Sequence, residues 1–400
     1  MPGAAVCVIG LSNRPGEAPR AEVLQALARH RVFCGGERHR QLVEPWLPPG
    51  HRWEALRHTA GLVALARAAG EPVAVLASGD PLFFGIAGAV RMAAPDLRVE
   101  VLPWFNSLQL LCHRIGLAYD RMLTVSVHGR GWHDLDAALI GDAALIGVLT
   151  DATHTPAAIA ARLLEYGFAG YVLHVGEALE APRELVRRLT LAEAAGLEFD
   201  PLNCVVLERT QDRPRCFGIP DAALACLDGR PDMLTKMPVR LTGLAQLDLP
   251  GRRCLWDIGT CTGSLAVEAR LAFPQLAVVA FERRAEGTTL LAENARRFGA
   301  PGITGVDGDF FAHDLAALPP PDAAFIGGHG GRLEAMLARL DAVLASGGRV
   351  VINAVQDSSR ATFEAVTAGL GYASLPPLRL QVDGHNPITV LAATKRAVAA

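Results

Sequence analysis

Short apolar runs that alternate with amphipathic stretches set the strongest limit on how this 400-residue chain can fold. In the first part of the chain, strands are expected at residues 4–9, 73–77, 98–102, 144–149, 170–175 and 203–207. Amphipathic helices are expected between them, at residues 20–28, 60–69, 107–115 and 156–166. Strand–helix alternation at this pitch predicts an α/β fold in which a mainly parallel sheet is covered by helices.

The alternation is interrupted once, at residues 209–231, in a polar stretch with three prolines and no strong period, which is typical of a linker. The second block has expected strands at 253–258, 277–281, 303–307, 323–326, 348–353 and 388–393, and expected helices at 264–272, 287–298, 332–344 and 358–370. We therefore predict two unrelated α/β domains, at residues 1–210 and 233–400, joined by a linker at 211–232.

Composition and charge exclude several kinds of protein. Half of the residues are hydrophobic and 20% are charged, which excludes a disordered chain. The net charge of −3 offers no basic surface for nucleic acid. The longest apolar stretch, residues 137–149, is interrupted by Asp142 and falls short of the roughly 20 residues that cross a membrane. The eight cysteines show neither CxxC pairs nor zinc spacing, so neither a metal site nor a disulfide is expected.

The start of the chain bears on its location. No basic segment precedes the first apolar run, and no convincing cleavage site follows it. We expect a cytoplasmic protein that forms homo-oligomers and has no membrane or nucleic-acid partner.

The most informative stretch is residues 255–264, Leu-Trp-Asp-Ile-Gly-Thr-Cys-Thr-Gly-Ser. An expected strand ends at Asp257, a glycine loop follows, and an expected helix opens at Ser264. Glycines let a backbone approach a ligand closely, and a helix N-terminus offers unpaired N–H donors. One such loop is weak evidence, because many strand–helix turns use glycine only for packing.

The next two strands end in residues that suit a nucleoside. Glu282, at the tip of the second strand, can accept hydrogen bonds from two ribose hydroxyls. After the third strand, Asp309 can accept from an adenine amino group and Phe310 can cover the adenine ring, although Asp309 alone would as readily be a helix cap. Because the carboxyl ends of parallel strands meet at one edge of a sheet, the three features together predict a nucleoside site there.

This ordered set resembles the class I S-adenosylmethionine-dependent methyltransferases, which have a Rossmann-like fold. Residues 321–331 and 347–355 narrow the resemblance to the C-terminal half of the fused two-domain precorrin C5,15-methyltransferases of cobalamin biosynthesis. The resemblance covers residues 233–400 and implies S-adenosylmethionine as cofactor. The cofactor-binding positions that it implies are Thr235, Gly259, Thr260, Cys261, Thr262, Gly263, Glu282, Asp309 and Phe310. The catalytic candidates in this half of the chain are His329 and Asn353.

Two positions depart from the pattern of this family. Cys261 stands where the glycine loop usually has another glycine, and a small side chain is tolerated there if its φ is negative. His329 stands where the family usually has a small hydroxyl residue. Decarboxylation requires a proton to be placed on carbon, and His329 can supply it near neutral pH.

Residues 76–86 form a second strand–loop–helix turn. Gly79 and Asp80 precede a rigid proline, which in isolation indicates a capped loop. The pair Phe83 and Phe84 is unusual in a loop, because aromatic pairs there tend to line a pocket or an interface.

The whole string, with residues 34–39, 105–110 and 126–130 in the same order, resembles the tetrapyrrole (class III) methyltransferases. This resemblance covers about residues 4–207 and implies a cofactor cleft between two subdomains. The cofactor-binding positions that it implies are Gly79, Asp80, Phe83 and Ser107, with the loop at residues 149–150 opposite.

The two resemblances imply methyl transfer from S-adenosylmethionine to ring carbons of a reduced tetrapyrrole. By resemblance, the N-terminal domain methylates C5, while the C-terminal domain decarboxylates the C12 acetate and methylates C15. Because such a substrate carries many carboxylates, Arg38, Arg130, Lys236 and Arg240 are candidates to rim the clefts.

Three other functions stay open. A bifunctional methyltransferase of another small molecule would keep both folds, and incubation with a precorrin would separate it from the first hypothesis. A non-catalytic tetrapyrrole-binding protein would show no cofactor binding in a titration. An NAD-dependent enzyme is the weakest alternative, because the loop at residues 259–263 lacks the full dinucleotide spacing.

Overall fold

The computed structural model describes residues 5–214, 217–228, 233–384 and 386–396, which excludes Ala4 of the first expected strand and residues 215–216 and 229–232 of the expected linker. Contacts within the chain divide it into two compact units. Unit 1 comprises Met1–Arg130, Ala144–Ala161 and Tyr171–Thr210, and unit 2 comprises Gly131–Ala143, Arg162–Gly170 and Gln211–Ala400. The domain boundaries at residues 210 and 233 stay predictions. None of the helices in the described ranges is long and apolar enough to cross a membrane.

The first sheet of unit 1 is wholly parallel, with the strand order β3-β2-β4-β1-β5. Its strands are β1 (Ala5–Leu11), β2 (Val32–Gly35), β3 (Arg52–Ala55), β4 (Val73–Ser78) and β5 (Arg98–Leu102). Between them lie α1 (Ala21–Arg29), α2 (Glu37–Val43), a 3-10 turn (Glu44–Trp46), α3 (Thr59–Ala68) and α4 (Ile86–Ala93). Alternate side chains of β1 face opposite cores: Val6 and Val8 pack with α3 and α4, and Cys7 and Ile9 pack with α1 and α2. Helices therefore cover both faces of this sheet.

The second sheet of unit 1 has the order β6-β7-β10-β8-β9, and in it only β6 and β7 pair in parallel. Its strands are β6 (Leu123–Ser126), β7 (Leu145–Leu149), β8 (Tyr171–Glu177), β9 (Leu185–Thr190) and β10 (Asn203–Arg209). Along the chain they alternate with α5 (Ser107–Ile115), α6 (His133–Ile140), α7 (Pro156–Glu165) and α8 (Leu191–Ala195). The expectation of a mainly parallel sheet is wrong here, because β10 returns between β7 and β8 and runs against both. The sequence of β7, α7 and β8 is that of an ordinary parallel crossover, so it does not reveal the insertion.

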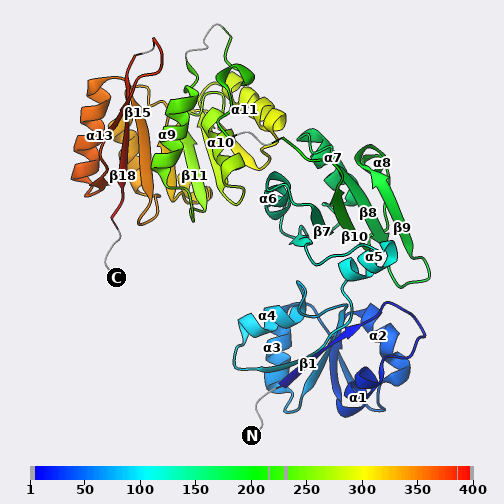
Figure 1. The fold of residues 1–400 in the computed structure, drawn as a ribbon. Coiled ribbons are helices and arrows are strands. Elements are labelled where there is room, and N and C mark those ends of the chain that lie inside the picture. The colour runs from blue at the N-terminus through cyan, green and yellow to red at the C-terminus, as the bar shows by residue number, and fades with distance from the viewer. Residues whose placement is uncertain (1–4, 215–216, 229–232, 385, 397–400) are drawn as a thin grey trace. The chain divides into compact units, whose positions relative to one another are not determined.

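Unit 2 contains a sheet of order β13-β12-β11-β14-β15-β18-β16, in which β13 to β15 are parallel and β18 is antiparallel. Its strands are β11 (Cys254–Ile258), β12 (Ala277–Glu282), β13 (Ile303–Asp307), β14 (Ala323–Ile326), β15 (Arg349–Ala354), β16 (Ala373–Ser374), β17 (Leu378–Leu380) and β18 (Ile388–Thr394). Its helices include α9 (Met237–Leu247), α10 (Ser264–Ala272), α11 (Ala285–Phe298), α12 (Leu333–Asp341) and α13 (Asp357–Gly369), with 3-10 turns at Asp221–Ala223, Phe310–Ala312 and Leu315–Ala317. Helices α9, α10 and α11 pack on one face of the sheet, and α12 and α13 pack on the other (Figure 1). This doubly wound arrangement confirms the Rossmann-like fold expected for the C-terminal block.

The described part of the expected linker packs onto unit 2. Ile219 and Leu224 are buried in the core that includes α9 and α10. Glu268 accepts the N–H groups of Gly218 at 2.6 Å and Ile219 at 3.0 Å, and its other oxygen pairs with Arg240 Nε at 2.7 Å. Arg240 is fully buried, so the expectation that it rims a cleft is wrong: its charge is matched by Glu268 inside the core.

Asn294 on α11 links the same segment to the glycine loop by hydrogen bonds. Its Oδ1 accepts the N–H of Ala225 at 2.8 Å, and its Nδ2 donates to the carbonyls of Ala225 at 3.1 Å and Thr262 at 2.9 Å. Asn294 is fully buried, so these bonds form away from water, where each is electrostatically stronger. The segment before α9 is thereby fastened to the loop that follows β11.

Candidate active sites

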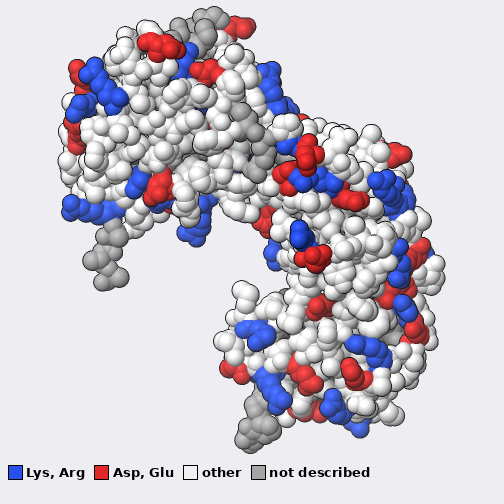
Figure 2. All heavy atoms as spheres, viewed as in Figure 1, with Lys and Arg blue, Asp and Glu red and all other residues white. Residues whose placement is uncertain are grey.

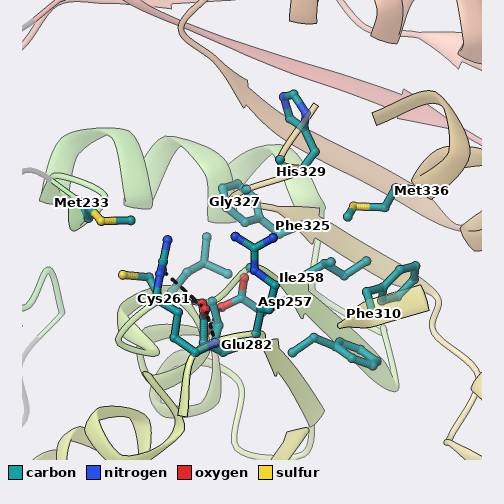
Figure 3. Close-up of a pocket in the computed structure, with 18 of the residues that line it drawn as sticks. Met233, Asp257, Ile258, Cys261, Glu282, Phe310, Phe325, Gly327, His329 and Met336 are labelled. Atoms are coloured by element: carbon teal, nitrogen blue, oxygen red, sulfur yellow. Dashed lines mark hydrogen bonds and ion pairs between the residues drawn. The ribbon is translucent and has the colours of Figure 1, made fainter. Parts of the chain in front are cut away.

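The first candidate site lies at the carboxyl edge of the sheet in unit 2, between β11 and β14. The strand order reverses there, with β12 and β13 on one side and β15 on the other, which is where open α/β sheets bind ligands. A cavity of about 210 Å³ opens at this edge. Figure 3 shows Met233 and Met336 on opposite sides of it, with Asp257 and Glu282 at the strand ends between them.

The glycine loop between β11 and α10 has the geometry of a ligand cradle. Gly259 has a φ of +74°, and a Cβ there would lie 2.8 Å from both the N and the O of Gly328. Gly263, with a φ of +77°, is the N-cap of α10. Cys261 has a φ of +58°, so the negative φ under which a small side chain is tolerated there is not what the structure has. The loop therefore holds a non-glycine residue in the left-handed region beside the cavity, which is strain of the kind found at functional sites.

Glu282, at the end of β12, anchors this loop. Its Oε2 accepts the N–H of Cys261 at 2.8 Å, and its Oε1 accepts the N–H of Arg284 at 3.0 Å. The side chain is buried against the protein yet lines the cavity. Its Oε1 also accepts from Arg284 Nη1 at 3.4 Å, whereas Oε2 keeps a lone pair for a ligand hydroxyl. Gly287 on α11 leaves room for it, because a Cβ at that position would lie 2.4 Å from Glu282 Cγ.

Asp257, which we did not count among the site residues, is a buried carboxyl group in the cavity wall. Thr260 Oγ1 donates to its Oδ2 at 2.5 Å. Burial raises the pKa of Asp257 to about 7, helped by the charge of Glu282 and opposed by hydrogen bonds from Thr260 and the backbone of Ala266. Its place as the last polar residue of a buried strand before a glycine loop is the signal that would have found it.

Asp309 and Phe310 lie where the third strand leads into the cavity wall. Asp309 accepts the N–H of Phe311 at 3.0 Å and pairs with Arg332 at 2.7 Å, and both interactions hold its pKa below the ordinary value. Phe310 is buried in the core, with its ring edge-on to that of Phe281 at 5.2 Å. Asp309 is therefore a carboxylate that caps the turn after the strand and pairs with Arg332, and Phe310 is a buried ring that contributes to the cavity wall.

His329 lines the same cavity, on the loop after β14. Its Nδ1 accepts the N–H of Gly331 at 3.2 Å, so the neutral ring carries its proton on Nε2, which lies 3.2 Å from Ser359 Oγ. Burial lowers the pKa of His329, which favours this neutral ring.

The other predicted positions of unit 2 divide into two groups. Thr235 and Thr260 line the cavity, whereas Thr262, Gly263 and Asn353 do not. Thr262 and Gly263 belong to the inner side of the loop, where Thr262 is buried. Asn353 is next to Ile352 at the end of β15, and its Oδ1 is buried without a hydrogen-bond partner in the described part of the chain.

The second candidate site is a cavity of about 240 Å³ within unit 1. All four predicted positions line it: Gly79, Asp80, Phe83 and Ser107. Leu149, from the second sheet, lines it as well, which agrees with the expected loop opposite. Gly79 has a φ of +62°, and Asp80 Oδ1 accepts the N–H of Leu82 at 2.9 Å, so the turn is both capped and part of the cavity.

Glu180 and Trp104 complete the wall of this cavity. Glu180 is 8% exposed, and its Oε2 accepts from Trp104 Nε1 at 3.0 Å and from the N–H of Asn13 at 3.2 Å. Arg14 pairs with its other oxygen at 3.2 Å. Sequence reasoning missed Glu180, because an acidic residue in a loop has no pattern that distinguishes it from a solvated one.

Both halves of the chain match family models. Residues 18–195 match the Tetrapyrrole (Corrin/Porphyrin) Methylases, and residues 228–399 match the Precorrin methyltransferase domain. A precorrin-6Y C(5,15)-methyltransferase [decarboxylating] from Sinorhizobium sp. is 34% identical over 387 residues, which cover 95% of this chain and 91% of that protein. The chain belongs to the decarboxylating precorrin-6Y C(5,15)-methyltransferases.

Two further relatives from Salmonella typhimurium are each named for one part of the chemistry in that family name. A cobalt-precorrin-6B C(15)-methyltransferase (decarboxylating) is 33% identical over 155 residues, 39% of this chain and 79% of that protein. A cobalt-precorrin-7 C(5)-methyltransferase is 26% identical over 201 residues, 50% of this chain and 96% of that protein. These matches confirm the resemblance that the motifs carry.

Basic residues do not gather on the face drawn in Figure 2, where blue and red side chains intermingle. Among the candidates to meet carboxylates, Arg38 lines the cavity of unit 1. Arg130 lies over the ring of Phe84 at 5.5 Å. Lys236 is the N-cap of α9, next to Thr235 of the other cavity wall.

Proposed function

We propose that this chain uses S-adenosylmethionine to methylate a precorrin at C5 and C15 and to decarboxylate its C12 acetate, as a step of cobalamin biosynthesis. The observation that carries the proposal is that each unit has its own cavity, lined by positions that its own motif set predicts. We assign C5 methylation to the cavity of unit 1, and decarboxylation with C15 methylation to that of unit 2. Similarity along nearly the whole length of a decarboxylating precorrin-6Y C(5,15)-methyltransferase supports both assignments.

The residues of both cavities fit this cofactor. In unit 2, Gly259 lets the loop at the cavity lie close to the backbone of Gly328, and Glu282 Oε2 keeps a lone pair for a ribose hydroxyl. In unit 1, Gly79, with a φ of +62°, and Ser107 line the cavity. When bound, the cofactor supplies an activated methyl group, so little covalent help from the protein is needed.

The work left to the protein is to align the reacting groups and to exclude water. Apolar side chains of the unit 2 cavity suit that role: Ile258 and Phe325 come from strands, and Met336 comes from α12. Below pH 7 the protonated form of the Asp257 carboxyl group predominates, because its pKa is about 7. Glu282 is then the carboxylate that we propose binds the ribose.

Decarboxylation leaves an electron pair on carbon that must take up a proton. We propose His329 as its source, because the ring lines the cavity. A pKa below the ordinary value makes the imidazolium form a stronger acid, although a minor species at pH 7. For Asn353 we propose a contact to a donor group of the substrate, because its Oδ1 has no partner among the described residues.

The decisive experiment incubates the purified chain with precorrin-6Y and S-adenosylmethionine and records the product by mass spectrometry. The expected product has gained two methyl groups and lost one carbon dioxide. Cofactor binding with no change in the precorrin would favour a methyltransferase of another small molecule, and lack of cofactor binding would favour a non-catalytic tetrapyrrole-binding protein. Homo-oligomer formation, a cytoplasmic location and the lack of a nucleic-acid partner stay predictions.

A further inference from the structure

Three side chains at the edge of the unit 1 cavity share one hydroxyl group. Arg38 and His39, at the start of α2, both lie within hydrogen-bond distance of Ser78 Oγ at the end of β4, at 2.5 Å and 2.8 Å. All three residues line the cavity that also contains Gly79 and Asp80. The cluster therefore borders the position at which we expect the cofactor and substrate to meet.

The hydrogen atoms of this cluster can be assigned one by one. His39 Nδ1 accepts the N–H of Gly36 at 3.3 Å, so the neutral ring has its proton on Nε2 and donates it to Ser78 Oγ. Burial, with the nearby charge of Arg38, lowers the pKa of His39 to about 4, so the ring is neutral at pH 7. Ser78 Oγ then accepts from His39 and from Arg38, which uses both of its lone pairs. What remains toward the cavity are donors: the hydroxyl hydrogen of Ser78 and the other N–H groups of Arg38.

The charge of Arg38 is not matched inside the described part of unit 1. No carboxylate there lies within ion-pair distance of Arg38, whereas Arg40 on the same helix pairs with Glu44 at 3.0 Å. Burial, with the nearby charge of Arg183, lowers the pKa of Arg38, and Arg183 itself already pairs with Asp200 at 2.7 Å. An anion bound here would offset the charge of Arg38.

We propose that Arg38 and Ser78 form a subsite for a carboxylate group of a ligand in the unit 1 cavity. A guanidinium presents parallel N–H groups that match the two oxygens of a carboxylate, and the Ser78 hydroxyl adds a third donor. His39 acts as a positioning residue, because its Nε2–H occupies a lone pair of Ser78 and thereby turns the serine into a donor. This subsite deepens the proposed function, on which it rests. The carboxylate belongs either to a side chain of the precorrin or to the amino-acid end of S-adenosylmethionine.

The test measures C5 methylation by the full chain, by mass spectrometry, with each substrate varied in turn. If the bound carboxylate belongs to the precorrin, Arg38→Met should raise the KM for precorrin-6Y roughly tenfold or more and leave the KM for S-adenosylmethionine unchanged. If the carboxylate belongs to the cofactor, the KM for S-adenosylmethionine should rise and that for precorrin-6Y should stay unchanged. Inhibition by S-adenosylhomocysteine should then weaken, while inhibition by 5′-methylthioadenosine, which lacks the carboxylate, should not. Arg38→Lys should recover part of the loss, because it keeps the charge without the paired donors.

Arg67→Met is the matched control, since Arg67 is an exposed arginine of unit 1 that already pairs with Asp96 at 2.9 Å. The subsite is rejected if folded Arg38→Met keeps both KM values within twofold of the wild type, or if Arg67→Met shows the same rise. Equilibrium binding of S-adenosylhomocysteine and of precorrin-6Y is measured on the same variants. A wild-type chain that binds both but transfers no methyl group would reject the proposed function, while the subsite would still be judged by binding.

Discussion

The carboxylate of Glu282 accepts the backbone N–H of Cys261 at 2.8 Å, and this bond joins the end of β12 to the loop that follows β11. Cys261 has a φ of +58°, in a region that residues other than glycine rarely adopt. Glu282 thus faces the cavity and also holds the backbone of the residue that leads into α10. Substitution of either residue should therefore alter the unit 2 cavity and the binding of a ligand there.

Replacing Glu282 by alanine should weaken cofactor binding in unit 2. The change removes a charged acceptor, which typically costs about 1.5–3 kcal/mol, and it releases the N–H of Cys261. The KM for S-adenosylmethionine in C15 methylation should rise roughly tenfold or more, while C5 methylation stays normal. Glu286→Ala, at an exposed position in the first turn of α11, is the control. Equal KM values for Glu282→Ala and wild type in the C15 reaction would remove Glu282 from the site.

Replacing Cys261 by glycine or by valine should change the stability of unit 2 in opposite directions. Glycine adopts positive φ freely, so Cys261→Gly should keep or raise the free energy of unfolding of unit 2, by up to about 1 kcal/mol. A β-branched side chain fits this region poorly, so Cys261→Val should lower it by about 1–2 kcal/mol. Denaturant unfolding of the two variants beside the wild type checks the order. A valine variant as stable as the glycine variant would show that the loop relaxes to a negative φ.

Gly259 and Gly347 offer a matched pair, because both have a φ of +74°. Alanine at either position meets the same backbone strain, roughly 1 kcal/mol. Only at Gly259 would the new Cβ also lie 2.8 Å from the backbone of Gly328, whereas at Gly347 nothing lies within 4 Å. Gly259→Ala should therefore lose decarboxylation and C15 methylation, and Gly347→Ala should keep them. Similar activities of the two variants would mean that the close approach to Gly328 does not matter.

The same Gly259→Ala variant should still methylate C5, because that reaction is assigned to the other cavity. Asp80→Trp gives the reciprocal lesion: a bulky ring in the unit 1 cavity should stop C5 methylation and leave carbon dioxide release and one methyl transfer. Mass spectrometry distinguishes the two products. If either lesion stopped all three changes in a folded protein, a single shared site would replace the two-site proposal.

Asp257 should make the stability of unit 2 depend on pH. Its pKa is about 7 in the folded chain and about 3.9 in an unfolded one, so between these values the folded state holds a proton that the unfolded state has released. The free energy of unfolding therefore falls as pH rises from about 4 to about 7 and levels off above. Asp257→Asn lacks this contribution, so its Tm relative to wild type should increase over that range. A Tm difference that stays constant from pH 5 to pH 8 would contradict the raised pKa.

Much of the unit 2 site could be predicted because strand ends determine it. Once Asp257, Glu282 and Asp309 are placed after successive parallel strands, they must meet at one edge of the sheet, and the structure has them there. The conformation of Cys261 could not be read in the same way. Its N–H is bonded to Glu282, which lies on another strand and is remote along the chain, so no local pattern reports this arrangement.

Long-range pairing also hid other features from the sequence. The antiparallel return of β10 between β7 and β8 leaves no local trace, because each strand has the ordinary apolar pattern. The burial of Arg240 depends on Glu268, which lies on a different helix, so an isolated arginine in the sequence looked like a surface charge. The same holds for Glu180, whose partners Asn13 and Trp104 come from distant loops.

The attachment of residues 217–228 has a consequence for dissecting the chain. Asn294 bonds both to Ala225 and to the carbonyl of Thr262, and Glu268 bonds to Gly218 and Ile219. A C-terminal fragment cut at residue 233 would leave Glu268 and Asn294 with unmet hydrogen bonds and would expose the part of the core in which Ile219 is buried. A fragment that begins before Phe217 would keep residues 217–228 and their hydrogen bonds. A stable C-terminal fragment should therefore start before Phe217 and not at residue 233.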